Sequence, residues 1–169
     1  MIVLEIVLFL MLLTIAWGAW TFAPWVPTHA RDISRAIALA GDIEGRTFIE
    51  LGSGDGRMTL AAARAGANAT GYEIAIPLFL IAWCRGKLTG SSAQFKFGDL
   101  FRTNLSHADV VFFFGMPKII ADRLRMKLEK ELKPGAIIIS YTFEVEGWTP
   151  VVTDKPEASA LSIYKYIRP

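Results

Sequence analysis

The chain is poor in the residues on which several enzyme classes depend. Its 169 residues include one cysteine, Cys84, and two histidines, His29 and His107. A single cysteine excludes a disulfide framework and a cluster of metal-binding thiolates, and the histidines lack the close spacing of a metal site. No Gly-x-Ser-x-Gly elbow or Walker loop is present. These absences argue against a hydrolase, an NTPase and a metal-dependent enzyme.

Net charge is also small. The chain has 18 Lys and Arg against 16 Asp and Glu, a formal charge of +2. This excess is too weak and too dispersed to indicate binding of nucleic acid. We therefore expect no nucleic-acid partner.

One long apolar stretch stands at the start of the chain. Ile2 to Phe22 contains a single charged residue, Glu5, and as a helix it would rise about 31 Å, close to the ~30 Å of a hydrocarbon core. A cleaved signal peptide would need a positive start and a shorter apolar run. We expect residues 1–23 to form a single transmembrane helix and to contact lipid. Trp17, Trp20 and Trp25 at its end, and Arg31, Arg35 and Arg46 beyond it, place the rest of the chain on the cytoplasmic side.

The remainder reads as a short link and one domain. Prolines in residues 24–30 predict a rigid link, and residues 31–169 alternate strand and helix patterns before ending in strand, loop and strand. This order predicts an α/β, Rossmann-like, mostly parallel seven-stranded sheet with a C-terminal antiparallel hairpin. The expected strands are 47–51, 69–73, 94–97, 110–114, 136–141, 151–153 and 162–167. A first helix is expected after the link and ends near residue 40, and three more are expected at 57–65, 77–88 and 117–132.

The most informative motif is the run Glu50-Leu51-Gly52-Ser53-Gly54-Asp55-Gly56-Arg57. It reads as the end of a strand, a turn with glycines at alternate positions and the start of a helix. Glycine tolerates positive φ and lets the backbone approach a ligand, while a helix start directs free N–H groups at it. The next strand ends at Glu73, where an acid accepts hydrogen bonds from ribose hydroxyls. We expect a nucleotide-like ligand there.

The spacing of the glycines favours S-adenosylmethionine over a dinucleotide. Dinucleotide sites have Gly-x-Gly-x-x-Gly, and Asp55 within the turn would repel a pyrophosphate. S-adenosylmethionine is cationic, so acids at positions 50, 55 and 73 suit it. After the third strand, Asp99 can accept a hydrogen bond from the adenine amino group. The expected cofactor-binding residues are Glu50, Gly52, Ser53, Gly54, Asp55, Gly56, Glu73, Asp99, Leu100 and Phe114.

Together these features resemble a class I, seven-β-strand S-adenosylmethionine-dependent methyltransferase. The segments FAPWVPT, ELGSGDGR, GYE, DLF and FFFGMP, with Trp148-Thr149-Pro150, are similar to the membrane-associated protein-lysine methyltransferases that modify the ATP synthase c-subunit and the adenine nucleotide translocase. The resemblance covers about Phe22 to Tyr166. It implies lysine N-methylation of a membrane protein, with the c-subunit as the leading candidate, and in a eukaryote it implies the mitochondrial inner membrane.

The exit of the fourth strand, Gly115-Met116-Pro117, should lie beside the transferable methyl group. Methyltransferases that act on adenine or glutamine have an Asp/Asn-Pro-Pro-aromatic sequence there, so planar substrates are disfavoured. We expect Gly115, Met116, Pro117 and Tyr141 at the catalytic centre. Aromatic side chains that could hold a methyl-lysine by cation–π contact are Phe114, Tyr141, Phe143 and Trp148.

Two other functions stay open. A methyltransferase acting on a lipid, quinone or other membrane-dissolved small molecule would equally explain an anchor. Such a substrate needs a lid, whereas a protein acceptor needs an open groove, and the lack of a long insertion after the fourth strand favours the protein. A non-enzymatic membrane scaffold is the second alternative, and the intact set of Glu50, the three glycines, Glu73 and Asp99 argues against it.

Overall fold

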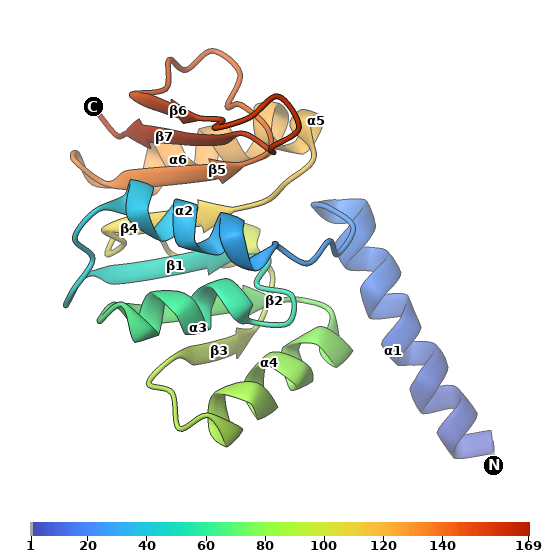
Figure 1. The fold of residues 1–169 in the computed structure, drawn as a ribbon. Helices are drawn as coiled ribbons and strands as arrows, with labels where there is room; N and C mark the ends of the chain where they lie inside the picture. The colour runs from blue at the N-terminus through green and yellow to red at the C-terminus, as the bar shows by residue number, and fades with distance from the viewer. Residues whose placement is uncertain (1) are drawn as a thin grey trace.

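The sheet has seven strands in the order β3-β2-β1-β4-β5-β7-β6 (Figure 1). A computed structural model describes residues 2–169. The strands from β3 to β5 are parallel, β7 pairs antiparallel with β5, and β6 pairs antiparallel with β7. The predicted fold class and terminal hairpin are therefore confirmed. The strands are β1 (Thr47–Leu51), β2 (Asn68–Glu73), β3 (Gln94–Phe97), β4 (Val110–Phe113), β5 (Ile137–Tyr141), β6 (Val152–Asp154) and β7 (Ile163–Ile167).

Helices cover both faces of the sheet. On one face lie α2 (Ala30–Ala40), α3 (Arg57–Arg64) and α4 (Ile76–Leu88), and on the other lies the segment from α5 (Pro117–Ile119) to α6 (Arg125–Glu131) (Figure 1). The expected single helix 117–132 is interrupted by a π-helical turn, η2 (Ile120–Leu124). The spacing of apolar residues does not reveal this π-helical turn, because Ile120 and Leu124 within it are buried as they would be in a regular α-helix. A short 3-10 turn, η1 (Leu100–Arg102), follows β3.

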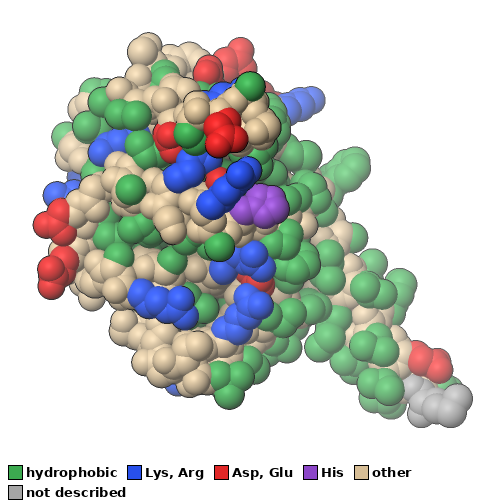
Figure 2. All heavy atoms as spheres, in the orientation of Figure 1, with side chains coloured by type: hydrophobic (Ala, Val, Ile, Leu, Met, Phe, Trp, Pro, Cys, Tyr) green, Lys and Arg blue, Asp and Glu red, His purple; other side chains and the backbone are tan. Residues whose placement is uncertain are grey.

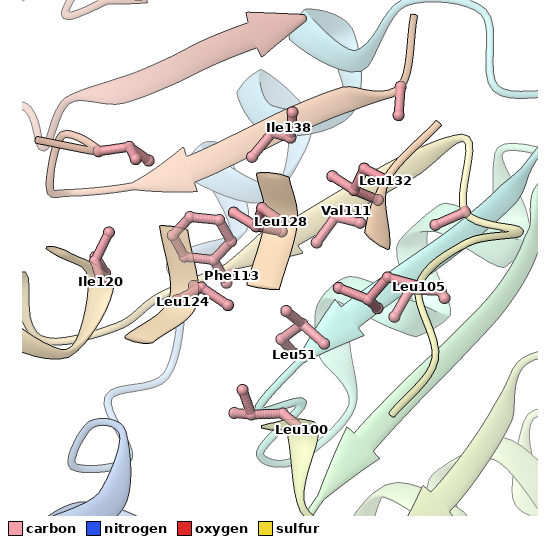
Figure 3. Close-up of a cluster of buried hydrophobic side chains, with 14 of the residues drawn as sticks. Leu51, Leu100, Leu105, Val111, Phe113, Ile120, Leu124, Leu128, Leu132 and Ile138 are labelled. Carbon is pink, nitrogen blue, oxygen red and sulfur yellow. The ribbon is translucent and has the colours of Figure 1, made fainter. Parts of the chain in front are cut away.

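The buried strands explain the two apolar cores. β4 is buried at every position because helices cover both of its sides. Even-numbered residues of β1 and β4, such as Phe48 and Phe112, belong to the core under α2 and α3, as do Ile137 and Ile139 of β5. Odd-numbered residues of β1 and β4, such as Val111 and Phe113, pack with Ile138 of β5 under η2 and α6, where Leu124 and Leu128 reach the sheet (Figure 3).

The first helix, α1 (Ile2–Thr21), projects from the domain (Figure 1). Within residues 2–169 it is the one helix long and apolar enough to cross a membrane, and no residue of it is buried. Figure 2 shows apolar side chains over nearly all of its projecting surface. The helix is therefore not part of the soluble core, while membrane insertion stays a prediction.

The predicted link, residues 24–30, is not a free spacer. Just before it, the carbonyl of Phe22 accepts a hydrogen bond from the Met116 N–H at 3.1 Å. At its other end, Arg57 Nη1 donates to the carbonyl of Thr28 at 3.0 Å. These contacts hold the segment across the carboxyl ends of β1 and β4. The link thus forms part of the wall of the cleft described next.

Candidate cofactor and active site

The glycine turn lies between β1 and α3, as predicted. Gly52, Gly54 and Gly56 all have positive φ, at 77°, 54° and 80°. A side chain at Gly56 would also collide with the ring of Phe95, because its Cβ would lie 2.6 Å from that ring. The Gly52 N–H donates to the Tyr72 carbonyl at 3.0 Å, which extends the pairing of β1 with β2 into the turn. Glycine is therefore required for both backbone conformation and space.

Glu73 lies at the end of β2 with its carboxylate beneath the turn. Its Oε2 accepts from the Gly54 N–H at 2.7 Å, and its Oε1 accepts from the Ile74 and Ala75 N–H groups at 2.9 and 2.8 Å. Burial raises the pKa of Glu73 even though these three donors favour the carboxylate. A carboxylate has about four acceptor positions, so one remains for a ligand hydroxyl.

Glu50 is buried at the base of the same cleft. Its Oε2 accepts from the Thr59 N–H at 2.8 Å and from the Thr59 hydroxyl. Burial raises the pKa of Glu50 to about 8. A bound cation would favour its ionised form, so the residue fits a cationic ligand more closely than a phosphate.

Asp55 does not offer the free negative charge that we expected from its place in the turn. Arg57 and Arg85 each contact its Oδ2 at 2.6 Å. Burial pushes the pKa of Asp55 upward, but the two guanidinium groups outweigh this and hold it below its ordinary value. The carboxylate is already neutralised by two cations. Asp55 therefore joins the turn to α4, and its expected contact with a cationic cofactor stays a prediction.

The remaining expected cofactor residues lie in or beside the cleft. Asp99 directly precedes η1, and its Oδ1 accepts from the Phe101 N–H at 2.8 Å, so one oxygen caps this turn. Leu100 is buried in the core and also lines the cleft. Phe114 faces the cleft, stacked against Phe143 at 6.1 Å between ring centroids. Ser53 has a buried hydroxyl with no partner in the described chain.

Two aromatic residues of the N-terminal segment complete the cleft, and sequence reasoning missed both. Phe22 is buried and packs against Gly52 and Gly115, whose built Cβ atoms would lie 3.3 and 2.7 Å from its ring. Trp25 lies over Gly54, where a Cβ would be 2.7 Å from the indole. The three glycines in the sequence indicate that other groups approach the backbone closely at these positions. They do not indicate which side chains do so.

The residues expected at the catalytic centre do not line the cleft. The ring of Phe22 lies against Gly115, and the Met116 N–H donates to the Phe22 carbonyl at 3.1 Å. Neither these two residues nor Pro117 is among those that line the space above the glycine turn. Tyr141 is buried, and its hydroxyl donates to Asp32 Oδ2 of α2 at 2.8 Å. Tyr141 thus points into the α2 side of the sheet, and burial raises the pKa of its hydroxyl. The catalytic roles expected for Gly115, Met116, Pro117 and Tyr141 therefore stay predictions.

The expected aromatic group around a methyl-lysine is also smaller in the structure. The ring centroids of Phe114 and Tyr141 lie 5.9 Å apart. Trp148 instead packs on Tyr166 at 5.6 Å, and its indole N–H donates to Glu129 at 3.0 Å. Of the four aromatic residues, Phe114 alone lines the cleft.

The cleft encloses about 880 Å³ of space, open solvent included. The last turn of α1 and the link form one side, and the ends of β1, β2 and β4 form the other. Acids suited to hydroxyl, amino and cationic groups lie at its base, and apolar rings lie around it. These residues fit S-adenosylmethionine. Across residues 2–169, no three His, Cys, Asp or Glu side chains gather into a metal-binding group.

Comparison with known proteins identifies the family. A model described as the ANTKMT methyltransferase domain matches residues 50–152. A protein-lysine N-methyltransferase of Saccharolobus islandicus is 33% identical over 85% of this chain and 92% of its own length. The chain belongs to this methyltransferase family. The human lysine N-methyltransferase named for the ATP synthase c-subunit is 34% identical over 75% of this chain and 54% of its own length. The chain thus spans little more than half of such relatives.

Solved structures agree with the family and its cofactor. An RNA methyltransferase of Salinibacter ruber in complex with S-adenosyl-L-homocysteine superimposes with a TM-score of 0.80, at 34% identity, over 85% of this chain and 94% of that one. A methyltransferase of Geobacter sulfurreducens, also with S-adenosyl-L-homocysteine, has a TM-score of 0.60 at 25% identity and covers 68% of this chain and 49% of its own. The predicted family and cofactor class, S-adenosylmethionine, are confirmed.

Proposed function

We propose that the chain is an S-adenosylmethionine-dependent protein-lysine N-methyltransferase that acts on lysines near the membrane surface of integral membrane proteins. The ATP synthase c-subunit is the leading candidate substrate. Relatives at about a third identity carry lysine N-methyltransferase names, for the c-subunit in human and rat and for the adenine nucleotide translocase in mouse. We place the chain in a membrane with its folded domain on the cytoplasmic side.

One observation carries the membrane part of this proposal. Ile15, Gly18 and Ala19 of α1 line the same cleft as the glycine turn. The apolar helix and the cofactor-binding residues are therefore parts of one site, with no flexible tether between them. A lysine that reaches this cleft must pass close to α1. If α1 lies in a bilayer, that lysine is close to the membrane surface.

The chemistry of the cleft also suits an amine acceptor. Bound S-adenosylmethionine supplies a methyl group on a sulfonium for in-line transfer, and the protein supplies alignment and electrostatics. A free lysine has a pKa near 10.4 and must lose its proton before it can attack. Apolar walls lower the pKa of a buried amine. Such walls are provided by Phe22, Leu78, Leu100, Phe101 and Phe114.

The experiment is transfer of labelled methyl groups into a fractionated extract of the source organism. The full-length protein and methyl-labelled S-adenosylmethionine are incubated with membranes, soluble proteins and RNA in separate reactions. We expect label in membrane protein, recovered as methyl-lysine after acid hydrolysis. Label that extracts with lipid would support the small-molecule alternative. Label released by ribonuclease would support an RNA substrate, as the name of the Salinibacter protein suggests. Either outcome would overturn the proposal.

Two variants control this assay. Gly54→Ala alters the turn beneath the cleft and should reduce transfer about tenfold or more at limiting S-adenosylmethionine. Gly90→Ala changes a glycine with a similar φ, 60°, in the turn after α4, where an added Cβ meets no atom within 4 Å. We expect its transfer to match that of the unaltered protein. Equal transfer by both variants would locate the active site elsewhere.

A further inference from the structure

The helix α4 lacks the polar outer face of an ordinary surface helix. Leu78, Ala82 and Gly86 are buried and mark its inner side. Its exposed outer positions include Leu80, Ile81, Trp83 and Leu88, and Leu88 is 86% exposed. Its charged residues, Arg85 and Lys87, both lie in its last turn. A helix on the surface of a soluble domain normally places polar residues outward. We call Leu80, Ile81, Trp83 and Leu88 the outer face of α4.

Other helices that cover the same sheet do not share this property. On α2 the exposed positions hold Arg31 and Ser34 together with alanines. The segment from α5 to α6 exposes four charged residues and one large apolar residue, Met126. Packing on the sheet therefore does not require an apolar outer side. The outer face of α4 is a separate feature that needs its own explanation.

α4 begins where α1 leaves the domain (Figure 1). The Ile76 N–H donates to Thr14 Oγ1 at 3.1 Å, and a Cβ at Gly18 would lie 3.2 Å from Ile74. Only residues 2–13 of α1 lie beyond this contact, and twelve helical residues rise about 18 Å, short of the ~30 Å of a hydrocarbon core. If all of α1 lay in the hydrocarbon core, the start of α4, which contacts Thr14, would lie roughly 10 Å deeper in the membrane than Thr21 at the end of α1.

The charged residues of the segment 74–98, which includes α4, have one sign. No Asp or Glu occurs between Glu73 and Asp99, whereas Arg85, Lys87 and Lys96 do. Arg85 is engaged with Asp55, but Lys87 and Lys96 form no ion pair with the described carboxylates. Apolar residues flanked by cations are typical of surfaces that lie in the headgroup region of anionic bilayers.

We propose that the outer face of α4 lies in the interfacial region of an anionic lipid bilayer beside α1. The domain then rests on the membrane at two places, and the cleft between α1 and the glycine turn is held at the bilayer surface. This inference rests on the membrane anchoring proposed above. It adds a second lipid contact, which determines the orientation and height of the domain.

Cys84 provides the probe for a direct test. It is exposed, is the one cysteine of the chain, and lies one helical turn from both Leu80 and Leu88. The full-length protein is labelled at Cys84 with an environment-sensitive fluorophore and reconstituted in vesicles of zwitterionic or mixed anionic lipids, at low protein-to-lipid ratio. Lipids with a quencher near the headgroup measure depth. We expect a blue shift, a several-fold rise in emission and strong shallow quenching, greatest with anionic lipid.

The matched control carries Cys84→Ser and Ser34→Cys, which moves the label to the outer side of α2. We expect that label to stay in water in the same vesicles. A second variant, Leu80→Asp with Leu88→Asp, changes only exposed positions and retains Cys84. It should lose most of the quenching, while Ser34→Asp should lose none. Binding of S-adenosylmethionine by each variant is measured in parallel and reports the proposed enzyme independently.

The outcomes separate the contact from the anchor. A protein that floats with vesicles while its Cys84 label remains in water would overturn the α4 contact and leave the anchor and the enzyme intact. A protein that does not float would overturn both membrane contacts. Quenching that appears only at high protein density, with crosslinking through Cys84, would assign the face to a second copy. If the Cys84 label left water only when another membrane protein was present in the vesicles, the outer face of α4 would be assigned to that partner. Either of these last two results would overturn the proposal.

Discussion

Replacing Gly54 with alanine tests the cleft at its most constrained point. Gly54 has φ of 54°, and its N–H donates to Glu73 Oε2 at 2.7 Å. An alanine Cβ would lie 2.7 Å from both Cδ1 and Nε1 of Trp25. The substitution thus strains the backbone, displaces an indole and disturbs a buried hydrogen bond, all within the expected cofactor site.

The magnitude has two parts. A left-handed conformation costs a non-glycine residue roughly 1–2 kcal/mol. Carbon atoms pack at about 3.5–4.0 Å, so the indole must also move by roughly 1 Å. Trp25 is 48% exposed and free to do so. We expect a loss of roughly 1–2 kcal/mol in unfolding free energy. Because the displaced indole and the disturbed Glu73 bond lie within the expected cofactor site, we also expect at least about tenfold weaker binding of S-adenosylmethionine, which is about 1.4 kcal/mol.

The assay pairs titration calorimetry with denaturant unfolding for Gly54→Ala, Gly90→Ala and the double variant Gly54→Ala with Trp25→Ala. Gly90→Ala should show a similar stability loss with unchanged cofactor affinity, because no atom lies near its Cβ. The double variant removes the collision, so its stability should be at least that of Gly54→Ala. Unaltered affinity in Gly54→Ala, or an equal affinity loss in Gly90→Ala, would refute this description of the site.

Three further predictions follow from the buried groups. Burial raises the pKa of Glu50 to about 8 from an ordinary value of 4.5, so between these pH values the folded state holds a proton that the unfolded state has lost, and the free energy of unfolding should fall as pH rises. The free energy of unfolding of Glu50→Gln should depend less on pH in this range. An equal slope in both proteins would contradict this prediction. Tyr141→Phe should lose about 1–3 kcal/mol of stability by removing the hydrogen bond to buried Asp32, with little change in methyl-transfer rate; a large loss of rate in a stable variant would restore the catalytic role expected from the sequence. Gly115→Ala should destabilise by about 1–3 kcal/mol in denaturant unfolding, because its Cβ would collide with buried Phe22, and unaltered stability would show that Phe22 packs differently.

The parts of the fold that could be predicted depend on residues that are close together in the sequence. β1, the glycine turn and α3 are predictable because the glycines alternate at the end of a buried apolar run. The position of Glu73 follows from the length of one strand-helix-strand unit. The terminal hairpin follows from the change to strand patterns after Gly135. Each prediction uses residues close together in sequence, with a backbone requirement that few residues satisfy.

The parts that could not be predicted depend on which side chains meet across the fold. The neutralisation of Asp55 by Arg85 joins the turn to α4, thirty residues away. Tyr141 stands at the carboxyl end of β5, as catalytic residues often do, but strand alternation alone does not show which face of the sheet it takes, and Asp32 binds it on the α2 side. The prolines of the link indicate stiffness, whereas nothing local indicates that Phe22 fills the space beside Gly115.

The central claim is lysine methylation of membrane proteins, and mass spectrometry of the source cells tests it most directly. Membrane and soluble proteins are compared between cells with the gene deleted and cells complemented with the unaltered chain, Gly54→Ala or Gly90→Ala. We predict one, two or three methyl groups on a lysine in a membrane-surface loop, foremost in the ATP synthase c-subunit. The methyl groups should be present with the unaltered chain and Gly90→Ala, reduced with Gly54→Ala and absent from the deleted cells. If gene-dependent methylation fell only on soluble proteins, lipids or RNA, the claim would be contradicted.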